Sequence, residues 1–271
     1  MHLAAVVVVY NVACQDSVTC QAFQQMDDPN LSVVIYDNST KDYGNRDFCN
    51  AHGWGYLGGT GNAGLSKAYN ACIAHIKTHT PAEAVCLFDD DTHISPDYFL
   101  ALRQAMSSGS EKIFVPLIYS NHALMSPSLL KPGHRIVRFE TDAEALSYTG
   151  KELSAINSCM ALRLSLFHNY RYDENIFLDG IDHKFLEDMK AGGQSVKVFP
   201  YRCDHAFSGD EKPTFQSAMV RFMIFNKDFG YILRKQPLTY CYLVGKRALK
   251  LTLQYRSPKF LLAMLQKNKA L

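Results

Sequence analysis

The stretch VCLFDDDTHI, residues 85–94, decides the fold of this chain. An apolar run over 85–88 leads directly into three consecutive carboxylates, Asp89, Asp90 and Asp91. The run is short for a helix and is bounded like a buried strand. We therefore expect the three acids where a central strand ends, which is the edge at which open α/β sheets bind ligands.

The three adjacent carboxylates repel one another, and a cation that joins them relieves this repulsion. A hard divalent cation suits oxygen ligands, and Mg²⁺ typically uses one or two protein carboxylates together with substrate phosphates. The acids therefore predict a cation site. The alternative is a solvated acidic turn, and the rest of the chain decides between the two.

Further apolar runs indicate the other strands of the sheet, at 3–9, 31–36, 113–119 and 195–201. Segments of helical length separate them, and one of these opens with Ser95-Pro96, a typical helix start. Continuous β-branched strands that alternate with helices predict parallel strands buried on both faces. We expect an α/β fold with a mostly parallel, mixed sheet flanked by helices. Residues 120–150 lack a clear period, and we expect a loop excursion there.

The composition is that of a packed protein, with 271 residues, 47% hydrophobic and 20% charged, enough for one large domain or a domain with an appendage. The charge is uneven. Residues 229–271 hold nine Lys and Arg and no acid, so 1–228 carry a net charge of −7. We interpret 1–212 as the main domain and 213–271 as a basic helical extension.

The cysteines and the N-terminus favour a cytoplasmic protein. Eight cysteines are scattered without a C-x-x-C pair or zinc spacing, which favours reduced, buried thiols. The opening MHLAAVVVVYN lacks the basic region and cleavage site of a signal peptide. No segment is long and uncharged enough to span a bilayer.

Six motifs occur in a fixed order: VVVVYN (6–11), YDNST (36–40), GTGNAGLSKAYN (59–70), DDDT (89–92), FLDGIDHKF (177–185) and CDHAFSG (203–209). As an ordered set they resemble the inverting family 2 nucleotide-sugar glycosyltransferases, most closely the bacterial rhamnosyl- and galactofuranosyltransferases. The resemblance covers about 3–235. It implies a GT-A fold (the Rossmann-like nucleotide-diphospho-sugar transferase fold) and metal-dependent transfer. The implied donor is dTDP-rhamnose or a UDP-hexose such as UDP-galactofuranose, and the acceptor is a glycan or lipid-linked saccharide in O-antigen or capsule synthesis.

The resemblance also implies a donor site. Tyr10 would stack on a pyrimidine base, although a tyrosine here could instead cap the core, and Asp37 would accept from the base N3–H, although Asp-Asn-Ser is also a common turn. The glycines of 59–64 would let the backbone approach the nucleotide. They follow the second strand region rather than the first, which counts against a dehydrogenase fingerprint. The expected donor residues are Tyr10, Asn11, Asp37, Asn38, Asn62, Gly64, Lys67, Asp89 and Asp90.

The metal and the catalytic base follow from the later motifs. By the family's D-x-D pattern, Asp89 and Asp91 bind Mn²⁺ or Mg²⁺, and His205 completes the metal shell. Asp182 takes the place of the general base, and Asp179 and Asn157 would lie on the acceptor side. The alternatives are that the two acids of the fifth motif favour a helix dipole and that the histidine is structural.

One departure from the family pattern stands in 221–235, where Phe225 occupies the position of a usual arginine; Arg221, one helical turn earlier, could replace it. Two other functions stay open. A nucleotidyltransferase would show a basic, glycine-rich triphosphate loop near the N-terminus, and VVVVYN is not one. A non-catalytic sugar- or lipid-binding domain would show decayed site residues, whereas Asp89, Asp91, Asp182 and His205 are present.

The tail over 238–266 combines apolar residues at helical spacing with Lys and Arg, and a break is expected at Ser257-Pro258. A basic amphipathic helix is typical of a membrane-surface element, which would place the protein peripherally at the inner face of the plasma membrane. Alternatively, the helices pack on the catalytic domain and the lysines are only solvated. Nucleic acid is not an expected partner, because it would leave the ordered acids unexplained.

Overall fold

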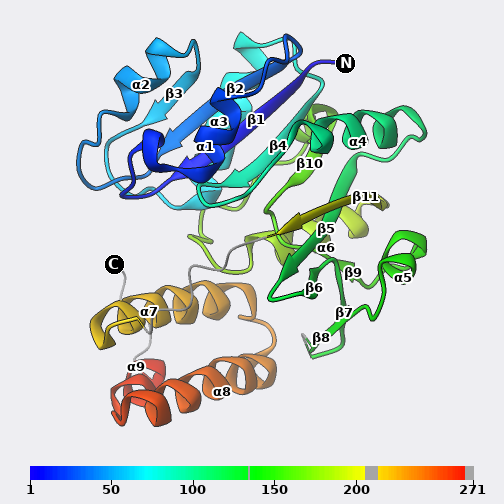
Figure 1. The fold of residues 1–271 in the computed structure, drawn as a ribbon. Helices are drawn as coiled ribbons and strands as arrows, with labels where there is room; N and C mark the ends of the chain where they lie inside the picture. Colours follow the sequence, from blue (N-terminus) through cyan, green and yellow to red (C-terminus); the bar gives the residue numbers. More distant parts are fainter. Residues whose placement is uncertain (134, 205–212, 266–271) are drawn as a thin grey trace.

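The computed structural model describes residues 1–133, 135–204 and 213–265, and its centre is one mixed sheet (Figure 1). Strand β1 (Leu3–Val9) pairs in parallel with β2 (Leu31–Asp37) on one side and β4 (Ala84–Asp89) on the other. The full order is β11-β5-β10-β4-β1-β2-β3, and β6 pairs with β5. The remaining strands of this sheet are β3 (Gly55–Gly58), β5 (Ile113–Ser120), β6 (Ala123–Ser126), β10 (Met160–Arg163) and β11 (Val196–Asp204).

Alternate side chains of each central strand pack into two cores, one on each face of the sheet. Ala4, Val6 and Val8 face the core closed by α3 (Leu65–His79) and α6 (Ile181–Ala191). The intervening side chains face the core closed by α1 (Val18–Gln24), α2 (Asn45–Ala51) and α4 (Pro96–Ser107). Burial on both faces explains why these strands are continuous apolar runs rather than alternating ones. The predicted α/β fold is confirmed.

Two regions differ from the sequence-based expectation. Strand β10 is antiparallel to both neighbours and lies between β4 and β5. Residues 120–150, expected to be a loop excursion, contain β6, the antiparallel pair β7 (Ser128–Lys131) and β8 (Arg135–Arg138), and helix α5 (Asp142–Ser147). Just after them, β9 (Leu153–Ser154) pairs with β7 and completes a small sheet. Its strands are two to four residues long, too short to show a period in the sequence.

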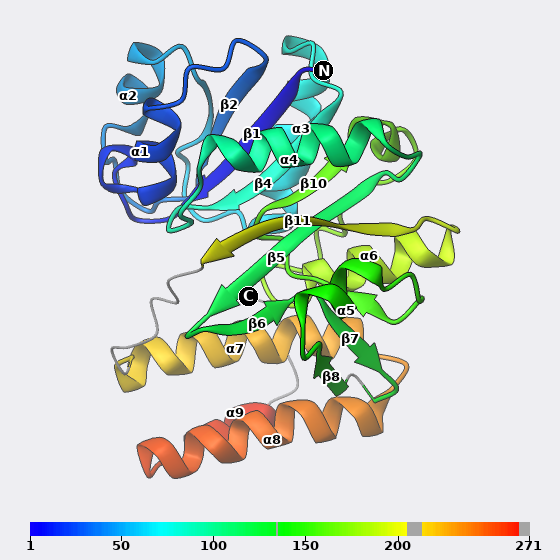
Figure 2. The ribbon, with the colours of Figure 1, turned by 45° about the vertical axis from the view of Figure 1, so that its right-hand side comes forward.

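The C-terminal part forms three helices, α7 (Phe215–Ile232), α8 (Pro237–Tyr255) and α9 (Lys259–Leu265). They enclose a third, smaller core around Phe222, Val244 and Phe260. The break between α8 and α9 falls at Ser257-Pro258, as predicted. Figures 1 and 2 show α7 next to the sheet domain and α8 on the far side of α7. Within the described residues, every helix is too short or too polar to traverse a bilayer.

Candidate active site

The carboxyl ends of three parallel strands meet at one edge of the sheet. In the register of the sheet, Val8 of β1 is opposite Asp89 of β4, and Val9 is opposite Asp37 of β2. The predicted residues Tyr10 and Asn38 therefore follow directly at the same edge. Parallel pairing alone brings together motifs that lie up to 80 residues apart in sequence.

Hydrogen bonds from α1 fix the backbone of the acidic turn. The Thr19 hydroxyl donates to the Asp89 carbonyl at 2.6 Å, and the Ser17 hydroxyl donates to the Asp90 carbonyl at 2.6 Å. The Thr92 amide donates in return to the Thr19 hydroxyl oxygen at 2.9 Å. The carbonyls are thus held from the α1 side of the turn, and the three carboxylates are partly exposed.

The neighbouring carboxylates of the turn repel one another. Burial, then the neighbouring charges of Asp91 and Asp89, raise the pKa of Asp90 to about 6, although a hydrogen bond from the Tyr10 backbone opposes the rise. A bound cation would remove this repulsion. The donor set of neighbouring carboxylates therefore fits a hard divalent ion.

A pocket of about 530 Å³ opens beside this turn. Its volume lies within the usual range for small-molecule sites. One wall comes from the strand ends and the glycine-rich segment, and the other comes from α7 and the segment before α6. The lining residues are Val8, Tyr10, Asn38, Asn62, Gly64, Leu65, Asp89, Asp90, Phe177, Leu178, Gln216, Ser217, Val220, Arg221 and Ile224. Six of the nine predicted donor residues are among them.

Asp37 lies behind this wall rather than in it, since it is only 3% exposed. Its carboxylate accepts hydrogen bonds from the Ser39 amide at 2.9 Å, the Asn45 side chain at 3.0 Å and the Tyr56 hydroxyl at 3.1 Å. Burial and the Asp37 charge raise the pKa of Tyr56 to about 12, so this hydroxyl stays a donor. Asp37 thereby fixes the turn that presents Asn38 to the pocket.

The glycine-rich segment approaches the segment FLDGIDHKF (177–185) very closely. A Cβ at Gly64 would lie 2.6 Å from Cδ2 of Phe177 and 2.8 Å from its carbonyl oxygen, and Gly64 has φ +84°. The Leu65 amide donates to the same carbonyl at 2.7 Å. Only glycine fits here, and the contact joins the start of α3 to the segment that carries FLDGID.

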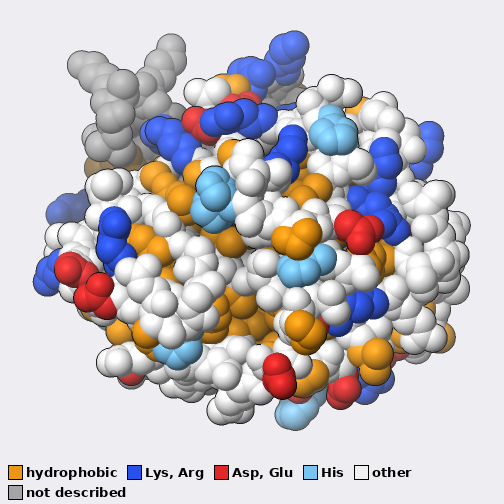
Figure 3. Space-filling view, turned by 90° about the horizontal axis from the view of Figure 1, so that it is seen from above, with side chains coloured by type: hydrophobic (Ala, Val, Ile, Leu, Met, Phe, Trp, Pro, Cys, Tyr) orange, Lys and Arg blue, Asp and Glu red, His pale blue; other side chains and the backbone are white. Residues whose placement is uncertain are grey.

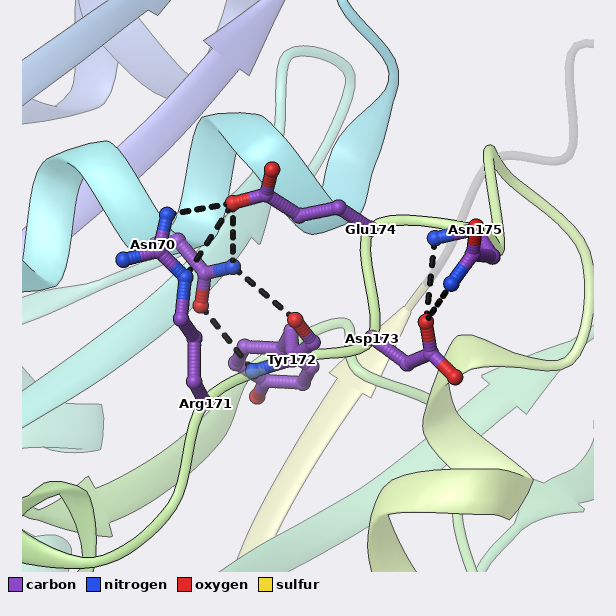
Figure 4. Close-up of polar contacts among 6 residues, drawn as sticks. All are labelled: Asn70, Arg171, Tyr172, Asp173, Glu174 and Asn175. Atoms are coloured by element: carbon purple, nitrogen blue, oxygen red, sulfur yellow. Dashed lines mark hydrogen bonds and ion pairs between the residues drawn. The ribbon is translucent and has the colours of Figure 1, made fainter.

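The Asn70 side chain on α3 holds the chain at Tyr172 and Glu174, a few residues before FLDGIDHKF, as Figure 4 shows. Its side-chain amide donates to the Tyr172 carbonyl and to Glu174, both at 3.0 Å, and its oxygen accepts from the Tyr172 amide at 3.0 Å. Arg171 forms an ion pair with the same Glu174 at 2.5 Å. The buried asparagine of AYN thus has a positioning role.

Helix α7 holds the start of the FLDGIDHKF segment from the other side. Buried Asp228 accepts hydrogen bonds from the backbone amides of Phe177 at 2.9 Å and of Leu178 and Asp179 at 2.8 Å. Burial raises the pKa of Asp228, and these three amides counteract the rise. Arg221, which lines the pocket, pairs through both of its terminal nitrogens with Asp179. Asp179, expected on the acceptor side, therefore orients an arginine at the pocket wall.

Asp182 and Asn157 lie around the buried side chain of Tyr69. Burial, then the charges of Asp89 and Asp182, raise the pKa of Tyr69, and a hydrogen bond from Asn157 lowers it. Asp182 lies in the first turn of α6 and accepts from the His183 amide at 2.7 Å. The Asn157 side-chain oxygen is buried and has no hydrogen-bond partner among the described atoms, so it offers an acceptor to a bound hydroxyl.

Three further predicted residues, Lys67, Asn11 and Asp91, are not among those that line the pocket. Lys67 is exposed on α3, where it contributes, after Arg171 and Asn70, to lowering the pKa of Glu174. Asn11 instead accepts from the Thr40 amide at 2.9 Å. Asp91 is half-buried in the acidic turn, and His205 lies outside the described residues. In the ranges that the structure describes, no group of three or more His, Cys, Asp or Glu side chains is placed to hold a metal.

Sequence reasoning missed the contribution of α7 apart from Arg221. Asp228 is the one acid of that helix and stands among apolar residues, which is the signal that could have singled it out. An isolated acid in an apolar helix must find buried donors. No local pattern shows that those donors are backbone amides about 50 residues earlier.

Comparisons with known proteins agree with this geometry. The family model described as Glycosyl transferase family 2 matches residues 5–171, more than half of the 271-residue chain. No curated protein matches the chain.

Solved structures share its architecture. The chain is similar to GalNAc-T7, solved with UDP, GalNAc and Mn²⁺, at 13% identity and a TM-score of 0.62, covering 98% of this chain and 56% of that one. It is also similar to S. aureus TarS 1-349, at 14% identity and a TM-score of 0.55, covering 98% of this chain and 81% of that one. A third similar structure is the mannosyltransferase PcManGT from Pyrobaculum calidifontis, solved with GDP-Man and Mn²⁺. Its identity to this chain is 16% and the TM-score is 0.56, covering 97% of this chain and 73% of that one.

At these identities the structural likenesses show the fold alone, which is GT-A. The family match carries more, because it includes β1, β2, β4 and the acidic turn that build one wall of the pocket. This chain belongs to glycosyltransferase family 2.

Proposed function

We propose that this glycosyltransferase moves a sugar, with inversion, from a nucleotide-sugar donor to a glycan or lipid-linked saccharide of a bacterial surface polysaccharide. One observation supports this most directly. A single pocket joins the strand-end acids Asp89 and Asp90 to Tyr10 on the strand side and to Arg221 on α7. An aromatic ring can stack on the base of a nucleotide, and a guanidinium can pair with its diphosphate. The carboxylates can hold the metal that accompanies the diphosphate.

The donor would lie along the pocket with its base beside Tyr10 and Asn38. Arg221 would face the diphosphate, because its guanidinium lines the pocket and is held in place by Asp179. Asp89, Asp91 and His205 would hold Mn²⁺ or Mg²⁺, which neutralises the departing diphosphate when it is bound. Neighbours solved with UDP or GDP-Man together with Mn²⁺ support this arrangement. We propose a UDP- or dTDP-linked sugar, with rhamnose or galactofuranose as the specific candidates.

Asp182 would act as the general base on the acceptor. Its carboxylate would take the proton of the acceptor hydroxyl as that oxygen attacks the anomeric carbon and the bond from that carbon to the diphosphate breaks. Asn157, with its buried and unpartnered oxygen, would orient the acceptor hydroxyl. Because attack comes from the face opposite the leaving group, the anomeric configuration would invert.

Isothermal titration with UDP, dTDP and GDP, each with Mn²⁺ and with a chelator, tests the donor site. We expect UDP or dTDP to bind only in the presence of metal. Absence of binding by all three nucleotides with metal present would refute the proposal and would leave the non-catalytic sugar- or lipid-binding alternative. The family match already favours a sugar transferase over a nucleotidyltransferase. The product's anomeric configuration, measured by NMR, tests inversion separately.

A further inference from the structure

Helix α8 has two apolar faces, and the residues that the structure describes cover only one of them. Val244 and Ala248 are buried against α7 and α9 in the third core. On another face, Leu238 is 86%, Leu249 51% and Leu253 71% exposed, and Tyr242 is also exposed. At 3.6 residues per turn these four side chains fall within an arc of about 60°. We call Leu238, Tyr242, Leu249 and Leu253 the α8 stripe.

Basic side chains flank the α8 stripe. Lys246 and Lys250 are exposed on one side of it, and Lys246 lies 6.0 Å from the centre of the Tyr242 ring. Arg256 and Lys259 are exposed beyond its C-terminal end. No Asp or Glu occurs anywhere after Asp228. The surface seen from above in Figure 3, opposite α8, instead carries charges of both signs.

The charges around the α8 stripe indicate which partner binds it. A second copy of this chain would place the same lysines opposite one another, because a two-fold interface pairs identical patches, and like charges across an interface are unfavourable. A solvent-facing helix surface with projecting Leu and Tyr side chains suits a fluid apolar phase. We infer that α8 lies in the interface of an anionic lipid membrane, with the α8 stripe among the acyl chains and the lysines at the headgroups.

The placement of α7 agrees with this orientation. Residues from the first half of α7 line the pocket, and α8 packs on its other side (Figure 2). A membrane on the stripe side would thus be separated from the pocket by α7 and α8, about two helix diameters or ~20 Å. Lipid binding by the stripe does not depend on the identity of the donor or on catalysis, so it is tested without either.

Co-sedimentation of the full chain with phosphatidylcholine vesicles, with and without phosphatidylglycerol, is the test. We expect strong binding only to the anionic vesicles, and loss of that binding at high salt because surface attraction is screened. Leu253→Ser should weaken binding about tenfold. The matched control is Leu100→Ser on α4, which removes an equally exposed leucine (68%) far from α8 and should bind as the wild type does.

A second pair of variants tests the charges. Lys246→Gln with Lys250→Gln should weaken binding to anionic vesicles about thirtyfold, since each lysine near such a surface contributes about fivefold. Lys41→Gln with Lys151→Gln, at exposed sites of the sheet domain, should have no effect. The inference is overturned if the wild type does not bind anionic vesicles at low salt, or if the stripe and control variants bind equally. A dimer in ultracentrifugation that Leu253→Ser dissociates, without vesicle binding, would assign the stripe to a second copy instead.

Discussion

Removing the Asp228 carboxylate should destabilise the protein and displace the FLDGIDHKF segment, which carries the proposed base Asp182. In Asp228→Ala, the partly buried backbone amides of Phe177, Leu178 and Asp179 lose an acceptor whose own side chain is fully buried. Each buried donor left unpaired costs about 1–3 kcal/mol. Three such donors, partly rehydrated by water in the cavity left behind, predict a loss of about 3–6 kcal/mol in the free energy of unfolding.

Asp228→Asn should be milder and separates hydrogen bonding from cavity formation. If its remaining oxygen serves the amides of Leu178 and Asp179, only the Phe177 amide loses an acceptor, so the loss should be about 1–3 kcal/mol. The assay is equilibrium urea unfolding followed by circular dichroism, with Asp27→Asn at an exposed site as the control. An alanine variant within about 0.5 kcal/mol of the wild type, as expected for an ordinary surface substitution, would refute the reasoning.

The same variants carry a catalytic readout. The amides held by Asp228 lie three to five residues before Asp182, so Asp228→Asn should lower kcat more than it raises the KM of the donor. A purely structural role would reduce the amount of folded enzyme without this split. The kinetic comparison is therefore made on variants purified in the folded state.

Four further predictions follow from the site. Asp182→Asn should lower kcat by about 10²–10⁴ while the donor affinity measured by titration stays near wild type; unchanged turnover would contradict the base assignment. Asp91→Ala should abolish the metal dependence of nucleotide binding in the same titration, and retained metal dependence would remove Asp91 from the metal site. Burial and its acidic neighbours raise the pKa of Asp90 from its ordinary value near 4 to about 6, so the metal-free protein loses stability as pH rises from about 4 to about 6 and changes little above that; Mn²⁺ should raise the Tm above about pH 7 and much less near pH 5, and equal shifts would contradict this. Gly64→Ala should lower stability by about 1–3 kcal/mol in urea unfolding, because a Cβ would meet Phe177 at 2.6 Å and φ is +84°; a neutral effect would show that the contact relaxes.

The sequence was most informative where a pattern is local. The run ending in Asp89–Asp91 predicted a buried strand and the edge at which the acids stand, because apolar periodicity and strand length are properties of neighbouring residues. Ser95-Pro96 marked the start of α4, and Ser257-Pro258 marked the break after α8. The ordered motifs predicted the family that the comparisons then showed.

Structure was needed wherever a contact joins distant segments. The insertion of antiparallel β10 between β4 and β5 depends on pairing across about 75 residues, and strands this short carry no signal of their partner. Asp37 has the composition of a turn, and only the fold shows that Asn45 and Tyr56 complete its hydrogen bonds. Asn70 likewise finds its partners about 100 residues away.

By itself, the sequence determined the α/β class, the strand-end acids, the start of α4 and the break after α8, because each is encoded within a few residues of itself. Only the tertiary structure decided that α7 closes the pocket, that Arg221 is held there by Asp179, and that Asp228 binds the backbone amides at the start of FLDGIDHKF. The physical reason is burial. A polar group removed from water must find a partner, but which partner it finds depends on how distant elements pack.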